Sequence, residues 1–134
     1  MLGRARQTWH VIRAGGSADE RHARRTADIL RSAGADEELV LAGLWHDIAK
    51  PVETRLWHRI AAVLLEHGAP AVRRRLARGD TVLGRYLDHP RRGADLAARR
   101  GASPRVVALI AGHHQAPRTN DEALLARADR EALP

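Results

Sequence analysis

A chain of 134 residues is long enough to bury one hydrophobic core and too short for two, so we expect a single domain over residues 1–134. Cysteine is absent, which excludes disulfides, thiolate metal sites and a cysteine nucleophile. Phenylalanine is also absent, aromatic residues make up only 3% of the chain, and the apolar residues are largely Ala, Leu and Val. This composition favours helices over strands, and it predicts an all-α fold.

The chain carries a net charge of +7, from 23 basic and 16 acidic residues, and Lys50 is its only lysine. Clustered basic residues are what phosphate contacts with nucleic acid require. However, arginine together with abundant alanine is also typical of a GC-rich genome, and the arginine runs stand beside Ala and Leu at helical spacing, as solvated helix faces do. Few aromatic residues are present to stack on bases. Nucleic-acid binding therefore stays open but is not favoured.

No stretch approaches about 18 consecutive apolar residues, and the N-terminal segment MLGRARQTWHVIRAGG contains no continuous apolar region. The sequence therefore predicts neither a membrane span nor a signal peptide. We expect a cytoplasmic protein.

Capping residues and the positions of Gly and Pro predict about seven helices. Ser17 and Glu20 have the spacing of a capping box, which opens a helix that runs to Gly34. Asp36 can cap a second helix, which Pro51 stops and which carries the His-Asp pair 46–47 in its last turns. Both helices show apolar residues at helical spacing.

The remaining helices are predicted by the same signals. They are an amphipathic segment over 56–67, a basic one over 70–78, a short turn of helix over 81–88, a segment from Pro90 to Gly101, a segment that Ser103 and Pro104 begin and that includes His113, and one that Thr119 and Glu122 open with capping-box spacing. No segment alternates as a strand would, and no repeat or low-complexity linker interrupts the chain.

Histidines and aspartates fall at apolar-facing positions of separate helices. They are His22, His46 with Asp47, His89, His113 with His114, and Asp129. Each of them alone is more typical of a core or capping residue than of a ligand. In combination, imidazole nitrogens and carboxylate oxygens are the ligands of Fe, Mn, Zn and Ni sites, and a buried carboxylate is costly without a cation. Converging helices can supply such ligands from different chain segments.

The segment LAGLWHDIAKP resembles the HDI(G/A)K signature of the HD-domain superfamily of metal-dependent phosphohydrolases, and the order H…HD…H…H…D extends over nearly the whole chain. The resemblance implies an α-helical HD fold with residues 1–134 as one HD domain. It also implies two divalent transition-metal ions, drawn from Fe, Mn, Ni, Co or Zn. By resemblance, His22, His46, Asp47 and Asp129 hold one ion, while Asp47 bridges to a second held by His89 and His113.

The implied activity is hydrolysis of a nucleotide or other phosphoester by a metal-activated hydroxide, with Asp47 and Lys50 as catalytic residues. Lys50 follows Asp47 by about one helical turn, so its ammonium could reach a phosphate at the centre. The alternative for Lys50 is a solvated side chain near a helix C-terminus. The expected partner is a small phosphorylated substrate such as a nucleotide.

Two other functions fit the same residues. Some proteins with a similar ligand arrangement are mixed-valent di-iron oxygenases, and an HD module without activity could bind nucleic acid or a partner through its basic surface.

One branch of the superfamily hydrolyses cyclic di-GMP and has a GYP-containing stretch where this chain has HHQAPRTND. The difference makes cyclic di-GMP an unexpected substrate and leaves the role of His114 open.

The other candidate residues have simpler interpretations. Surface or packing roles are expected for the histidines His10, His58 and His67, and core positions for Trp45 and Trp57. Solvated helix faces, rather than phosphate clamps, are expected for three arginines, which are Arg85, Arg92 and Arg118.

Overall fold

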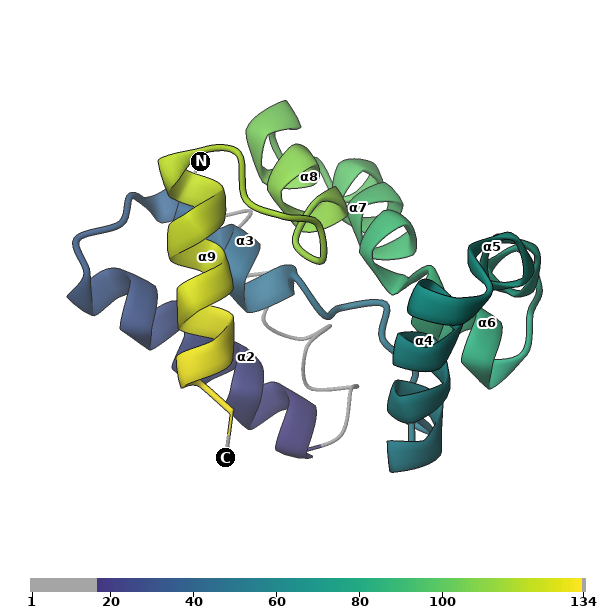
Figure 1. The fold of residues 1–134 in the computed structure, drawn as a ribbon. Helices are drawn as coiled ribbons and strands as arrows, with labels where there is room; N and C mark the ends of the chain where they lie inside the picture. Colours follow the sequence, from purple (N-terminus) through teal and green to yellow (C-terminus); the bar gives the residue numbers. More distant parts are fainter. Residues whose placement is uncertain (1–16, 134) are drawn as a thin grey trace.

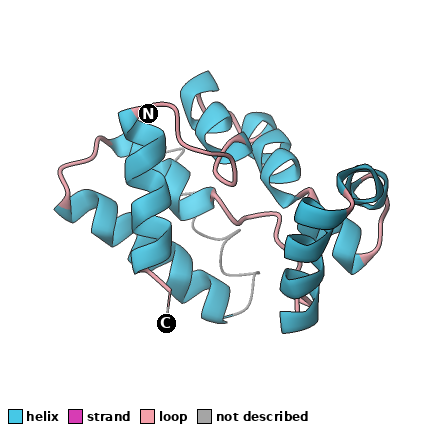
Figure 2. Ribbon diagram, in the orientation of Figure 1, coloured by secondary structure: helices cyan, strands magenta, loops and turns pink. Residues whose placement is uncertain are grey.

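The computed structural model describes residues 17–133 (Figure 1). His10, and the N-terminal stretch for which no signal peptide is predicted, lie outside these residues. The described part consists of helices and loops without strands (Figure 2), so the all-α prediction is confirmed. The eight helices are α2 (Ser17–Ser32), α3 (Glu37–Trp45), α4 (Leu56–Gly68), α5 (Pro70–Ala77), α6 (Val82–Leu87), α7 (His89–Arg99), α8 (Pro104–Ala111) and α9 (Asn120–Glu131).

Several helices begin where the capping residues predict. The side chains of Asp36, Ser103 and Thr119 accept hydrogen bonds from the main-chain N–H three residues later, at 2.9, 3.3 and 3.1 Å. Each bond satisfies one of the free N–H groups in the first turn of its helix. Gly34 and Gly101 follow α2 and α7 with φ of 78° and 86°, a left-handed conformation that glycine adopts without strain.

The helices pack in two groups (Figure 1). In the larger group, α2 packs on α3 and α9, α8 packs on α3 and α7, and α9 also packs on α3. Its core is mainly Ala, Leu and Val with Ile110 and Trp45, and α2 and α3 approach so closely that a Cβ on Gly43 would meet the Leu30 side chain. In the smaller group, α4, α5 and α6 pack on one another, and α6 also contacts α7.

Two helices end earlier than predicted. The helix expected to run to Pro51 stops at Trp45, and the helix expected to include His113 stops at Ala111. In both places the chain continues in tighter turns, with N–H groups bonded to carbonyls three residues earlier. His46, Asp47 and His113 therefore lie just beyond helix ends and not in the last helical turns.

One core prediction is confirmed and one is wrong. Trp45 is buried, but Trp57 is 55% exposed because its side of α4 packs against no other described helix. Within residues 17–133, we find no helix long and apolar enough to cross a membrane.

Candidate metal centre

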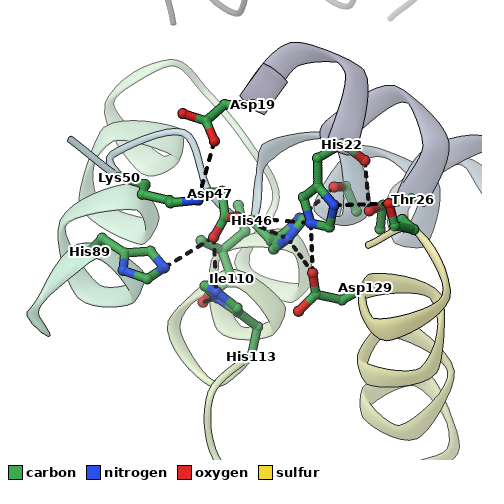
Figure 3. A network of polar contacts seen from close by, with 12 residues as sticks. Asp19, His22, Thr26, His46, Asp47, Lys50, His89, Ile110, His113 and Asp129 are labelled. Carbon is green, nitrogen blue, oxygen red and sulfur yellow. Dashed lines mark hydrogen bonds and ion pairs between the residues drawn. The ribbon is translucent and has the colours of Figure 1, made fainter. Parts of the chain in front are cut away.

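The residues predicted as metal ligands come together in two adjacent groups of side chains (Figure 3). They come from α2, from the turns after α3 and α8, from the start of α7 and from the last turns of α9. The first group is His22, His46 and Asp129, and the second is Asp47, His89, His113 and His114. Within each group the potential ligand atoms all lie within 4.8 Å of one another.

Asp47 lies between the two groups, and its two carboxylate oxygens point in different directions. Oδ1 is 3.0 Å from Nε2 of His89 and 3.5 Å from Nε2 of His113. Oδ2 is 3.5 Å from Nε2 of His46 and 4.0 Å from Nε2 of His22. One carboxylate can therefore offer one oxygen to each group, as a ligand bridging two ions must.

The other ring nitrogen of these histidines contacts a main-chain carbonyl. In three of them Nδ1 donates at 2.6 Å to the carbonyl oxygen three residues earlier: His46 to Gly43, His89 to Tyr86 and His113 to Ile110. In His22, Nδ1 is 3.4 Å from the carbonyl oxygen of Ala132. With the proton on Nδ1, the lone pair of each neutral imidazole is on Nε2, which faces the centre of the site.

The donor atoms of the first group fit a cation. Nε2 of His22 and Nε2 of His46 are 2.7 and 3.1 Å from the same Oδ1 of Asp129. When the histidines are neutral, these short contacts bring lone pairs against a carboxylate oxygen and are repulsive. A proton on Nε2 removes the repulsion, and so does a cation. A divalent ion would accept all three donor atoms at once, since imidazole and carboxylate are its usual ligands.

The electrostatics of the site follow from these contacts. Burial by itself lowers the pKa of His46, but the charge of Asp47 and the hydrogen bond and charge of Asp129 outweigh it and raise that pKa to about 9. Burial likewise raises the pKa of Asp129, but the hydrogen bonds from His22 and His46 hold it well below the usual value. The pKa of Asp47 is likewise held well below its usual value. Burial by itself raises this pKa, but the charge of His46 and the neighbouring rings of His113 and His89 outweigh it. The site is thus built to hold positive charge.

Comparison with known proteins identifies the fold. A family model for the HD domain matches residues 20–133, which is most of the chain. The chain belongs to the HD domain family. Members of this superfamily bind divalent metals, and many are metal-dependent phosphohydrolases. No curated protein and no solved structure matches the chain.

The second group of this HD domain also fits a metal ion. Nε2 of His113 is buried and has no hydrogen-bond partner among the described residues, although it faces Asp47. A buried polar atom without a partner is costly, and a metal ion would provide one. The exposed His114 adds a further potential ligand, with its ring centroid 4.7 Å from that of His89 and 4.4 Å from that of His113.

Lys50 is neither solvated nor free at the edge of the site. Its side chain is only 10% exposed, and its Nζ donates at 3.1 Å to Oδ1 of Asp19 in the first turn of α2 (Figure 3). The sequence pattern does not point to Asp19. The only signal is its position one turn before His22, which places the two side chains on one face of α2. The contact with Lys50 joins residues 31 positions apart and depends on the fold.

The remaining candidates lie outside the two groups. Arg92 donates hydrogen bonds to Asp88 and to the carbonyls of Ala77 and Gly79, so its guanidinium links α7 to the end of α5 and the loop that follows. Arg118 is exposed, and Nε of Arg85 lies 3.9 Å from Oδ1 of Asp80. His58 is buried and accepts a hydrogen bond from the main chain at the start of α4, while His67 is exposed. The expected surface or packing roles fit both histidines.

Proposed function

We propose that this HD domain is a metal-dependent phosphohydrolase that cleaves a nucleotide or another phosphoester. The observation that carries the proposal is the position of Asp47, whose two oxygens face two separate groups of histidines. Two divalent ions bound there would supply Lewis acidity and an activated water for attack on phosphorus. No nucleophilic side chain is then required, which agrees with the absence of cysteine.

Each of the two ions would be held by its own set of side chains. His22, His46 and Asp129 would hold the first ion, His89 and His113 the second, and Asp47 both. The Nδ1 bonds to main-chain carbonyls keep each ring oriented and each Nε2 available before an ion arrives. Binding then requires little rearrangement of the chain.

Lys50 would bind the phosphoryl group of the substrate. An ammonium has three donors, and Asp19 uses one of them in the structure. The remaining donors are available to phosphoryl oxygens that gain negative charge during the reaction. The net charge of +7 adds a general attraction for anionic substrates.

The proposal is tested by loading the purified protein with Mn²⁺, Fe²⁺, Ni²⁺ or Co²⁺ and measuring phosphate release from a panel of nucleotides and other phosphoesters. We expect turnover by the loaded protein and none after Asp47→Asn, which keeps the side-chain shape but weakens the bridge between the groups. Asp95→Asn is the matched control, because Asp95 is an exposed carboxylate on α7 that pairs only with Arg91 among the described residues.

Metal content gives an independent readout. Elemental analysis should find about two equivalents in the loaded protein and about one after His89→Gln, since that change removes a ligand of the second group alone. Full metal content without turnover on the whole panel would contradict the phosphohydrolase. Substrate-dependent O₂ uptake with a mixed-valent iron signal would instead identify an oxygenase. Salt-dependent nucleic-acid binding that survives Asp47→Asn would identify a binding module.

A further inference from the structure

Helix α4 turns its more hydrophobic face toward solvent. The exposed apolar side chains of this face, here called the α4 face, are 52% to 71% exposed: Leu56, Trp57, Ile60, Val63 and Leu64. The exposed His67 lies on the same side of the helix. Their spacing of three and four residues places them on one side of the helix. The opposite side, with the buried His58 and the partly buried Ala61, Ala62 and Leu65, packs on α5 and α6. The arrangement is the reverse of an ordinary surface helix, whose apolar side faces the core.

The area of the α4 face is large enough to matter for association. Five large side chains, each more than half exposed, leave on the order of 500 Å² of apolar surface in water. A standard interface buries about 800 Å² on each partner, so this face would form most of its apolar centre. The Trp57 ring is also fixed before any contact forms, because it stacks on His58 with ring centroids 3.8 Å apart. Aromatic side chains held in this way are typical of interface centres.

Charge along one edge of the α4 face shows which partner fits. Arg59 and Glu66 are exposed, seven residues apart and therefore on the same edge of the helix. Neither forms an ion pair among the described residues, and the charge of Arg59 acts on the neighbouring Tyr86 of α6. In an antiparallel pair of α4 helices centred between residues 62 and 63, Arg59 of one copy lies opposite Glu66 of the other. A two-fold axis makes this contact twice. A parallel two-fold pair would place this edge of the two copies on opposite sides of the contact, so Arg59 and Glu66 could not meet there.

The other edge of the same face is complementary in shape. The pairing that sets residue 59 against 66 also sets Trp57 against Gly68, the last residue of α4. A Cβ built on Gly68 would meet nothing within 4 Å, so the space beside it is open. The largest side chain of the α4 face would thus lie against a residue that has no side chain. Charge and shape select the same register.

We propose that the α4 face is the contact between two copies of this chain, which pack as an antiparallel pair of α4 helices. The contact is isologous, with the apolar residues at its centre and two Arg59–Glu66 pairs at its rim. It does not depend on the metal centre or on any hydrolytic activity.

The first test is the mass of the full-length protein by analytical ultracentrifugation from about 1 to about 100 µM, a range that detects micromolar dissociation constants. We expect a dimer. Leu64→Glu should raise the dissociation constant at least about 100-fold, because it places a charge at the centre of the contact in both copies. Leu133→Glu is the control: Leu133 is 55% exposed, lies after α9 and should leave the mass unchanged. A monomer at every concentration overturns the proposal.

The second test examines the register. Arg59→Glu and Glu66→Arg should each weaken the dimer about tenfold by placing like charges together, and the double variant should regain its affinity because the pairs are restored in reverse. Since the chain contains no cysteine, Val63→Cys should cross-link the dimer near the two-fold axis on oxidation, whereas Leu133→Cys should not. A double variant no better than the single ones, or equal cross-linking at both positions, excludes the antiparallel pair.

Discussion

The buried His46 makes the stability of the metal-free protein depend on pH. Its pKa is raised from 6.5 to about 9 by Asp47 and Asp129, which outweigh the opposing effect of burial. A raised pKa in the folded state means that the stabilisation is fully present below about pH 6.5 and is lost as the pH rises through about 9. The difference corresponds to on the order of 3 kcal/mol of unfolding free energy, because one pKa unit is worth about 1.4 kcal/mol. Asp47 and Asp129 stay ionised throughout this range, since their pKa values lie below the ordinary value of 3.8.

Urea unfolding in the presence of a chelator, at a series of pH values from about 6 to about 9.5, measures this effect. The wild-type protein should lose up to about 3 kcal/mol more across the range than His46→Gln, whose side chain cannot take up a proton. His67→Gln, at an exposed position on α4, should keep the wild-type dependence on pH, whatever its effect on the α4 face. Equal pH dependence in the wild type and in His46→Gln would refute the reasoning, because the proton would then not be held between His46 and the two carboxylates.

Three further substitutions test the packing and the site. Gly84→Ala should destabilise the protein by about 2 kcal/mol or more in urea unfolding, because the new Cβ would lie 2.5 Å from the carbonyl oxygen of Leu76 and 2.8 Å from that of Gly79. Asp19→Asn should lower kcat on the best phosphoester about tenfold by weakening a charge-assisted bond to Lys50, with metal content unchanged. Lys50→Arg should also lower kcat, because the side chain is only 10% exposed and a planar guanidinium is larger; activity equal to the wild type would show that the site does not require the compact ammonium of a lysine.

The helices were predictable from the sequence because their signals are local. Asp36, Ser103 and Thr119 cap helices as expected, and Gly34 ends one in the left-handed conformation. The ends of α3 and α8 were not predictable, since His46 and His113 continue the helical pattern of apolar residues. In the structure each of these rings bonds to a carbonyl three residues earlier, where the chain turns more tightly than an α-helix.

The candidate site was predictable only where a motif carries it. The order of histidines and aspartates led to both groups of candidate ligands, although spacing alone does not show that the two oxygens of Asp47 face different groups. Asp19 has no motif, and its contact with Lys50 arises from the packing of α2 beside the turn after α3. Trp57 was misassigned because an amphipathic pattern shows that a helix has an apolar side and does not show what covers that side.

The main-chain carbonyls that bind Nδ1 have an evolutionary consequence. In many metal sites the group behind a ligand histidine is a carboxylate, so one substitution can change how strongly that ligand donates electrons. Here the groups behind His46, His89 and His113 are peptide carbonyls, which every amino acid provides. Point mutations cannot remove these acceptors. In the proposed metal centre, selection for a different metal or reactivity would therefore have to replace the candidate ligands themselves, and the orientation of the remaining rings would survive such changes.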